Sequence, residues 1–328
     1  MKVFRKLIHY LKDVKATAAQ AGFKGLHKLL IMLDVIYCRI RFGCKCREYR
    51  VYQFHRYKDN YRKNFLLFYH LHKHYGNDKT MDRSKYKKIQ EVQLGFSREI
   101  LMMPECGEDA FLDFIRRHKK IVIKPDVGNG GDGVSVVEYT DDDAASALFR
   151  SLTRKTLCEE YIYQHEEINR MNPYCLNTLR IVTLLSDDVF SMICATIKTA
   201  VTPEAVTDNF HASGVGASID LNTGVVNSYA RGYHKQCYVD HPITGEPIFG
   251  KKIPHWDKIA PLLCEAHKRI PEVPVVGWDI AIVPQGIEIV EVNMNPGPLL
   301  MQIMDGVPKG EKIIQHMKKQ KKSGMKQK

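Results

Sequence analysis

The stretch "GWDIAIVPQGIEIVEVNMNPGP", residues 277 to 298, constrains the fold more than any other part of this chain. Its two aliphatic runs have the pattern of short buried strands, and residues 284 to 286 between them have the composition of a tight turn. The stretch is therefore predicted to form a β-hairpin. Counting outward from the turn pairs Asp279 with roughly Glu291, and two facing carboxylates beside an apolar hairpin repel each other. We expect a positive group between them.

Asn293 adds a third oxygen to this pair of carboxylates. It lies two residues beyond Glu291, and residues two apart on a strand point to the same face. Two carboxylates and an amide oxygen are hard ligands that suit Mg²⁺ or Mn²⁺. A hairpin with ordinary polar ends is the alternative. The third oxygen and the like-charge pairing favour a metal site formed by Asp279, Glu291 and Asn293.

A glycine-rich loop joins two predicted strands in "IVIKPDVGNGGDGVSVVEY", residues 121 to 139. Its glycines are Gly128, Gly130, Gly131 and Gly133. A dinucleotide fingerprint would lead into a helix, and a Walker loop would end in Gly-Lys-Ser/Thr, but this loop does neither. Because it runs from strand to strand, it is predicted to be a flap whose backbone N–H groups close over phosphates, with Lys124 reaching an α- or β-phosphate. A turn whose glycines only permit positive φ is the simpler alternative.

Positive charge is concentrated at the two ends of the chain, whose 328 residues have a formal net charge of +12. Residues 1 to 60 hold 14 Lys/Arg and 4 Asp/Glu, a net +10, and residues 307 to 328 hold 8 Lys and one Glu, a net +7. The stretch between them is therefore net −5. Basic ends predict an anionic partner, either a membrane surface or an acidic glycan, with nucleic acid less favoured. A solubilising helical face and a frayed lysine tail explain the charge equally well.

Cysteine usage and hydropathy predict where the protein resides. The nine cysteines are odd in number and lack paired zinc spacing, which favours a reducing compartment over a disulfide framework. No signal peptide is recognised, and the longest apolar stretch near the start, "LLIMLDVIYCRI", is short and carries Asp34. It is not expected to span a bilayer. We expect a cytoplasmic protein, attached peripherally at the inner face of the membrane if the basic ends bind lipid.

The chain is predicted to have four parts. In residues 1 to 78, apolar residues recur near helical spacing among Lys and Arg, so a basic helical region is expected. Residues 79 to 160 hold the lysine and the glycine flap, and residues 161 to 305 are rich in strand patterns and end in the hairpin. Residues 306 to 328 form a basic tail that is predicted to be disordered.

The order of these features resembles the ATP-grasp superfamily. Lys124 precedes a glycine flap, a strand ending "LCEEYI" and then "NTLRIVTLL" follow, and the hairpin comes last. The segments "HEEINRMNPYCLNTLRIVTL", "DNFHASGVGASIDLNTGVV" and "HPITGEPIFG", with the hairpin, are similar to the sugar-transfer-associated ATP-grasp branch of polysaccharide loci. The resemblance covers roughly residues 80 to 300. It implies an α+β fold in which two α+β subdomains clamp ATP between their sheets, behind the basic helical N-terminal region.

This resemblance implies roles for individual residues. The implied nucleotide-binding residues are Lys124, assisted by Lys85 or Lys88, the four flap glycines, the backbone of Glu159, Glu160 and Ile162 at the adenine, and Glu166 or Glu167 at the ribose. The implied catalytic residues are Arg180, Lys198 and Asn295, with Asn177 facing the site, and Asp279, Glu291 and Asn293 would hold the metal. A solvated strand end is the alternative for all four glutamates, Glu159, Glu160, Glu166 and Glu167, and a structural salt bridge is the alternative for Arg180. His211 stays outside the set, because lone histidines are more often packed than catalytic.

The resemblance implies a carboxylate–amine ligase that uses ATP and Mg²⁺ (or Mn²⁺), works through an acyl phosphate and releases ADP. For this branch it implies an amino acid or amine joined to a uronic-acid sugar or a similar carboxylate in surface polysaccharide biosynthesis. A phosphotransferase of the same fold, acting on a hydroxyl, is the alternative. A non-catalytic nucleotide- or glycan-binding module is disfavoured, because Lys124 and the predicted metal ligands are all present.

Overall fold

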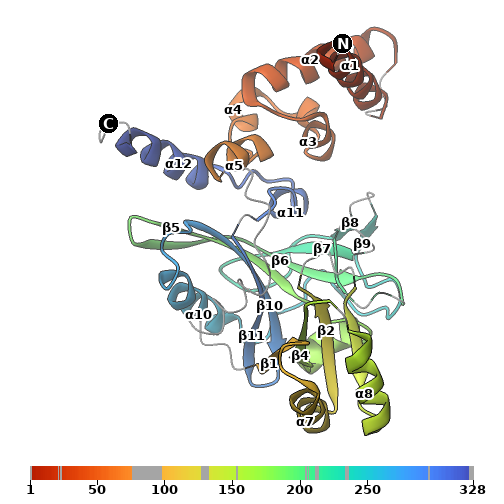
Figure 1. Ribbon diagram of the computed structural model, residues 1–328. Coiled ribbons are helices and arrows are strands. Elements are labelled where there is room, and N and C mark those ends of the chain that lie inside the picture. The colour runs from red at the N-terminus through yellow and green to blue at the C-terminus, as the bar shows by residue number, and fades with distance from the viewer. Residues whose placement is uncertain are drawn as a thin grey trace. The chain divides into compact units, whose positions relative to one another are not determined.

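The computed structural model shows two compact units, one formed by Met1–Asn77 with Gly297–Lys328 and the other by Asp78–Pro296 (Figure 1). The residues that the structure describes are 2–20, 22, 24–75, 98–126, 133–152, 154–203, 205, 207–210, 214–232, 236–294 and 296–324. Each unit has its own hydrophobic core, so each is described by itself below.

The first unit is helical, which confirms the helical character predicted for the N-terminal region. Its elements are α1 (Lys2–Gln20), α2 (Gly25–Phe42), α3 (Cys46–Val51), the 3₁₀ turn η1 (Phe54–Arg56), α4 (Asp59–Arg62), α5 (Phe68–Tyr75), α11 (Leu300–Ile303) and α12 (Glu311–Gly324). The core is rich in aromatic rings, with Tyr52, Phe54 and Phe65 packed together at ring-centroid distances of 4.8 to 5.9 Å. Among the described residues, no helix is long and apolar enough to cross a bilayer.

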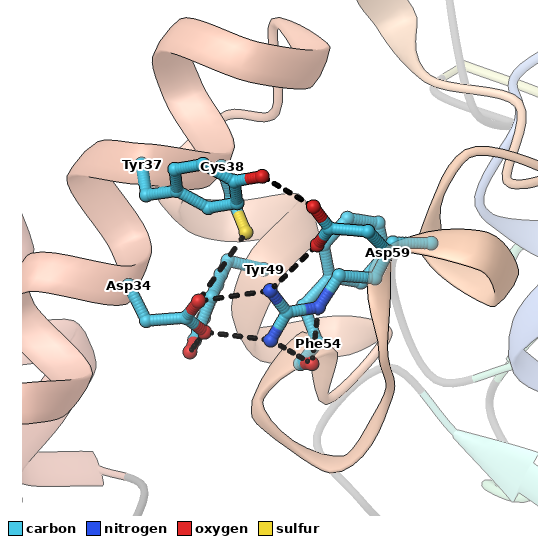
Figure 2. Close-up of polar contacts among 7 residues, drawn as sticks. Asp34, Tyr37, Cys38, Tyr49, Phe54 and Asp59 are labelled. Atoms are coloured by element: carbon cyan, nitrogen blue, oxygen red, sulfur yellow. Dashed lines mark hydrogen bonds and ion pairs between the residues drawn. The ribbon is translucent and has the colours of Figure 1, made fainter.

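A buried arginine organises the polar interior of this unit (Figure 2). Arg62 donates from Nη1 and Nη2 to the two carboxylate oxygens of Asp34, at 2.8 and 2.7 Å, and from Nε to the carbonyl of Phe54 at 2.9 Å. The hydroxyl of Tyr49 donates to the same carboxylate at 2.5 Å. Asp34, the charge that interrupts the apolar stretch of α2, is therefore the partner of a buried cation.

Gln302 fastens the C-terminal segment to the N-terminal helices. Its side chain is fully buried. The Nε2 group donates at 2.9 Å to the carbonyl of Leu66 and to the hydroxyl of Tyr52, while Oε1 accepts from the backbone N–H of Leu66 at 2.9 Å. Because a buried amide that loses such partners is left unsatisfied, this one side chain makes the segment after residue 297 part of the helical unit.

The predicted disordered tail is wrong for residues 311–324, which form the helix α12. Its lysines dominate the composition, but Ile313, Ile314 and Met317 recur at helical spacing and are buried. Just before the helix, the backbone N–H of Gly310 donates to the carbonyl of Asn64 at 2.9 Å. Apolar periodicity, rather than net charge, determines the structure here.

The second unit contains a four-stranded antiparallel sheet in the order β1-β4-β2-β3. The strands are β1 (Ile100–Met103), β2 (Lys120–Pro125), β3 (Ser135–Glu138) and β4 (Thr156–Glu160), and the helices are α7 (Glu108–His118) and α8 (Asp142–Ser151). Phe111 and Phe114 of α7 and Ala145 of α8 pack against Ile121 and Cys158 of the sheet, so both helices cover one of its faces (Figure 1). The other face of this sheet carries Lys124.

A seven-stranded antiparallel sheet in the order β11-β10-β5-β6-β7-β8-β9 forms the rest of this unit. Its elements are α9 (Glu166–Met171), β5 (Leu179–Ser186), β6 (Val189–Ala200), β7 (Gly214–Ile219), β8 (Ala230–Gly232), β9 (Cys237–Tyr238), α10 (Trp256–Lys268), β10 (Val275–Val283) and β11 (Gly286–Asn293). Ile259 and Leu263 of α10 share one apolar core with Ile181, Ile197 and Trp278 of the strands. Because side chains alternate along a strand, the residues next to these in sequence face the opposite side.

Candidate active site

The predicted hairpin is confirmed, and it places the two carboxylates opposite each other. Strands β10 and β11 pair antiparallel, with Asp279 opposite Glu291 and Gly277 opposite Asn293. The pairing is irregular between Asp279 and Ile280, so the counting from the turn holds only because β11 has one extra residue there. Glu291 and Asn293 lie on one face of β11, two residues apart.

Arg180 supplies a positive group beside the facing carboxylates. It pairs in register with Asp279 through β5 and β10 and donates from Nε and Nη2 to both of its carboxylate oxygens, at 2.6 and 2.7 Å. Burial acts to lower the pKa of Arg180, but Asp279 and then Glu291 outweigh it, and the pKa is raised. The salt bridge that the sequence left as an alternative for Arg180 is therefore present.

Lys198 of β6 adds a second cation to the same cluster. Its Nζ lies 3.4 Å from Oδ1 of Asp279 and 3.2 Å from Oδ1 of Asp208. Burial acts to lower the pKa of Lys198, but the two carboxylates raise it, so the ammonium stays charged. For Asp279, burial acts to raise the pKa, and the attraction of Arg180 and Lys198 lowers it to about 2. The cluster is therefore ionised at neutral pH.

Asp208 is a residue that the sequence reasoning did not single out. Its Oδ2 accepts from the backbone N–H of Thr178 at 2.8 Å and from the Thr178 hydroxyl at 2.5 Å, while Oδ1 holds Lys198. Asp208 opens the "DNFHASG" segment that carried part of the family resemblance. That segment was the available signal. The contact between Asp208 and Lys198 could not be predicted from it, because it depends on how the loop before β7 lies against β6.

Gly214 lets the loop that carries Asp208 lie directly against β7. A Cβ at Gly214 would lie 2.5 Å from the carbonyl oxygen of Asp208 and 2.6 Å from the carbonyl carbon of Asn209. Both contacts are to backbone, so the loop would have to move. We expect Gly214→Ala to destabilise the protein by about 1–3 kcal/mol, as overpacking does elsewhere.

Urea unfolding at neutral pH measures this effect. Gly297→Ala is the matched control, because a Cβ there meets no atom within 4 Å. Equal stability of the two variants would mean that the loop is not held against β7 as described.

On the four-stranded sheet, Lys124 contacts a buried glutamate. Its Nζ lies 2.8 Å from Oε2 of Glu159, which also lies 3.3 Å from Nη2 of Arg98. Arg98 in turn donates to Glu288 of β11 at 2.9 Å and to the carbonyl of Ile289 at 3.2 Å. Arg98 thus connects the strand that holds Glu159 with the strand that holds the predicted metal ligands.

The adenine-edge residues only partly match their expected role. Glu159 lies in β4 between β1 and β2, and its buried carboxylate, not its backbone, makes the contact with Lys124. The N–H of Glu160 donates to the carbonyl of Glu99 at 3.1 Å, so it is already used within the sheet. Ile162 follows the end of β4, and its role stays a prediction.

The remaining predicted residues fall in several places. Glu166 and Glu167 begin α9, where Arg170 forms ion pairs with both, so they are on a helix rather than at a strand end. Asn177 is buried and donates to Gln164 Oε1 at 2.9 Å and to the carbonyl of Asn172 at 2.7 Å, so it holds a loop instead of facing the site. Predicted positions outside the described residues are Lys85, Lys88, Gly128, Gly130, Gly131, His211 and Asn295.

Gly133 is the flap glycine that the structure describes. Its φ is +74°, which favours glycine, and a Cβ there would lie 2.7 Å from the ring of Pro125. The simpler interpretation, a turn that needs positive φ, therefore applies to this glycine. The flap role of the other three stays a prediction.

The donor set at the hairpin fits a hard divalent cation. Asp279, Glu291 and Asn293 offer carboxylate and amide oxygens, and Nδ2 of Asn293 is buried with no hydrogen-bond partner among the described residues. Arg180 occupies both oxygens of Asp279, but each carboxylate oxygen has a second lone pair. The described residues contain no group of three or more His, Cys, Asp and Glu side chains that could hold a metal by themselves. A metal here depends on the amide and on ligands from a bound nucleotide.

The unit that spans Asp78–Pro296 thus combines a four-stranded sheet that carries Lys124 with a seven-stranded sheet that carries the cation–carboxylate cluster. Residues 78–315 match the model of the sugar-transfer associated ATP-grasp family, and the chain belongs to this family. The comparison with curated proteins found no match.

Three solved structures illustrate the similarity. The ATP-grasp ligase PsnB, complexed with a phosphomimetic variant of its minimal precursor, Mg and ADP, is 13% identical over 73% of this chain and 59% of that chain, with a TM-score of 0.45. D-alanyl-alanine synthetase A from Vibrio cholerae O1 biovar eltor is 12% identical over 73% and 64%, with a TM-score of 0.45. D-alanine–D-alanine ligase from Bacillus anthracis is 14% identical over 74% and 69%, with a TM-score of 0.44. The chain thus spans less than two thirds of the first two proteins.

Proposed function

We propose that this protein is an ATP- and Mg²⁺-dependent carboxylate–amine ligase that forms ADP. The observation that carries the proposal is the cluster on the face of the seven-stranded sheet opposite α10. There Arg180 and Lys198, both charged, surround Asp279, and Glu291 and Asn293 stand on the neighbouring strand. Such a concentration of fixed charge suits a transferring phosphoryl group, which needs positioning and charge neutralisation more than covalent chemistry.

In the proposed site the oxygen donors of the cluster bind the metal and the cations contact phosphate. Asp279, Glu291 and Asn293 would hold Mg²⁺ (or Mn²⁺), which neutralises phosphate charge when it is bound together with ATP. Arg180 uses two of its five N–H donors to bind Asp279, which fixes its guanidinium in place and leaves its other donors for a phosphate. Lys198 is held between two carboxylates and would meet the γ-phosphate.

Lys124 would contact the α- or β-phosphate from the other sheet. Without nucleotide its ammonium is bound by Glu159, so ATP phosphates compete with this carboxylate for the same cation. Glu159 keeps Arg98 as a partner when Lys124 turns to the nucleotide. The flap, Lys85 or Lys88, the adenine-edge backbone, Glu166 and Asn295 complete the proposed site.

The proposed reaction has two steps. A carboxylate oxygen of the substrate attacks the γ-phosphorus, the bond to the ADP oxygen breaks, and an acyl phosphate forms. An amine nitrogen then attacks the acyl carbon, loses a proton, and inorganic phosphate leaves, so that an amide remains. We propose a uronic-acid sugar or a similar carboxylate as acceptor and an amino acid or amine as donor, in polysaccharide biosynthesis at the cytoplasmic face of a membrane.

Hydroxylamine trapping tests this proposal. With Mg²⁺ and ATP, we expect ADP release to require a carboxylate, and hydroxylamine to replace the amine and give a hydroxamate. Candidate uronic acids and amino acids form the acceptor panel, and reactions without ATP or without carboxylate are the controls. A stable phosphate ester on a hydroxyl acceptor, formed with no hydroxamate from any acid in the panel, would instead identify a kinase.

A further inference from the structure

Helix α2 has two apolar faces, of which one packs into the core of the helical unit and the other is largely exposed. Val35 and Cys38 are buried in the core of that unit. The large apolar side chains Leu26, Leu29, Leu30, Leu33, Tyr37 and Ile40 are 42 to 81% exposed. Their spacing of 0, 3, 4, 7, 11 and 14 residues places all six on one side of the helix, opposite the buried face.

Helix α1 repeats this arrangement in its N-terminal half. Phe4, Leu7, Ile8 and Leu11 are spaced i, i+3, i+4 and i+7 and are 42 to 68% exposed, whereas Val14 and Ala18 further along are buried. Together the two helices contribute ten of the 20 large apolar side chains that are exposed in the described part of the chain. We name these ten residues the α1–α2 apolar surface. Such a concentration indicates an interaction site, because single exposed apolar residues are normally scattered.

The same two helices are strongly basic. Residues 2 to 42 hold nine Lys/Arg and two Asp, a net charge of +7. One of these acids, Asp34, is already paired with the buried Arg62. The other, Asp13, lies 3.8 Å from His9. The polar positions around the α1–α2 apolar surface therefore present positive charge with little to offset it.

We propose that the α1–α2 apolar surface docks this protein on an anionic lipid bilayer, with both helices lying in the interface. Exposed apolar side chains with surrounding Lys and Arg are the combination that binds such a surface, through apolar burial and attraction to anionic headgroups. A second copy of the chain fits less well, because pairing two surfaces of the same sign brings like charges together. No described helix is long and apolar enough to cross the bilayer, so the attachment is peripheral.

This inference stands apart from the proposed ligase activity. It rests on residues 2 to 42, whereas the proposed active site lies in the unit that spans Asp78–Pro296. Turnover of ATP in solution is accordingly expected to be unchanged by substitutions on the α1–α2 apolar surface.

Sedimentation of the full chain with vesicles tests the docking. We expect binding to phosphatidylcholine vesicles that contain phosphatidylglycerol, no binding to pure phosphatidylcholine, and a steep loss of affinity with added salt. The double variant Leu29→Ser with Leu33→Ser is expected to bind at least about tenfold more weakly, because it removes apolar side chains that docking on the bilayer would bury. Arg5→Gln with Lys6→Gln should also weaken binding. Val189→Ser with Val239→Ser, at exposed sites of the other unit, is the matched control and should bind like the parent.

A fluorescence measurement separates insertion from charge attraction alone. Leu33→Trp is expected to shift its emission to the blue on adding anionic vesicles, whereas Val189→Trp is expected to stay unshifted. Circular dichroism and sedimentation velocity of each variant, without vesicles, report its folding and oligomeric state. No binding to anionic vesicles by the folded parent, or binding without a blue shift at position 33, would overturn the proposal. So would a serine variant that changes the oligomeric state but keeps its vesicle affinity, since the surface would then be a contact between copies.

Discussion

Asp279→Ala is expected to destabilise the protein by about 3–5 kcal/mol, because it leaves the largely buried Arg180 without its carboxylate partner. Asp279 is only 5% exposed and accepts two short hydrogen bonds from Arg180. Lys198 keeps Asp208, whereas Arg180 loses Asp279, the one carboxylate with which it forms an ion pair in the described part of the chain. Urea unfolding at neutral pH measures the loss. Glu265→Ala, an exposed carboxylate on α10, is the control and is expected to stay within about 0.5 kcal/mol of the parent.

Two further measurements show whether the pair itself is responsible. Replacing both partners, as Asp279→Leu with Arg180→Met, is expected to recover part of the loss, because no charge is then left alone. The pKa of Asp279 in the folded state is about 2, below its ordinary value of 3.8. Its contribution is therefore complete well above pH 3.8 and is lost as the pH falls through about 2. Additive losses in the double variant, or a parent–variant difference that grows on acidification, would contradict the buried pair.

Glu291→Gln is expected to lower ATP turnover by at least about a hundredfold, the size of effect seen when one electrostatic stabiliser of a transition state is removed. Glu291 is half-buried and faces Asp279 across the hairpin. Its removal relieves a like-charge repulsion, so the free energy of unfolding should not fall. ADP release under saturating Mg²⁺ and ATP, with a carboxylate that gives a hydroxamate in the trapping assay and with Glu265→Gln as control, measures the change. Turnover close to that of the parent would show that Glu291 is not a metal ligand.

Local patterns were enough to predict the hairpin and the side of it that carries polar residues. Strand alternation and a turn at residues 284 to 286 place Asp279 within one residue of Glu291 without any knowledge of the rest of the chain, and the bulge between Asp279 and Ile280 sets the final pairing. Arg180 could be assigned to the site only by resemblance, because its contact with Asp279 depends on β5 lying next to β10, almost 100 residues away in sequence. Such non-local strand pairing leaves no trace in a local pattern.

The misplaced residues have two physical causes. The resemblance gave Glu159 a role through its backbone, and the burial of its carboxylate, which pairs with Lys124 and Arg98, was not foreseen. Asp208 was missed because only the folded sheet brings it to Lys198. The tail was expected to be disordered because its many lysines were given more weight than the helical spacing of Ile313, Ile314 and Met317 in α12. For Glu159 and Asp208 a tertiary partner decides where the side chain lies, whereas α12 follows an apolar spacing that was already present in the sequence.

The measurement that tests the nucleotide–metal site most directly is a Mn²⁺ titration followed by electron paramagnetic resonance. We expect the parent to bind Mn²⁺ tightly only in the presence of ATP or ADP, because Asp279 is already engaged by Arg180 and Lys198 and cannot hold the cation with Glu291 and Asn293 alone. Glu291→Gln should lose this nucleotide-dependent binding, whereas Glu265→Gln should keep it. Tight Mn²⁺–nucleotide binding by Glu291→Gln, equal to that of the parent, would contradict the site described here.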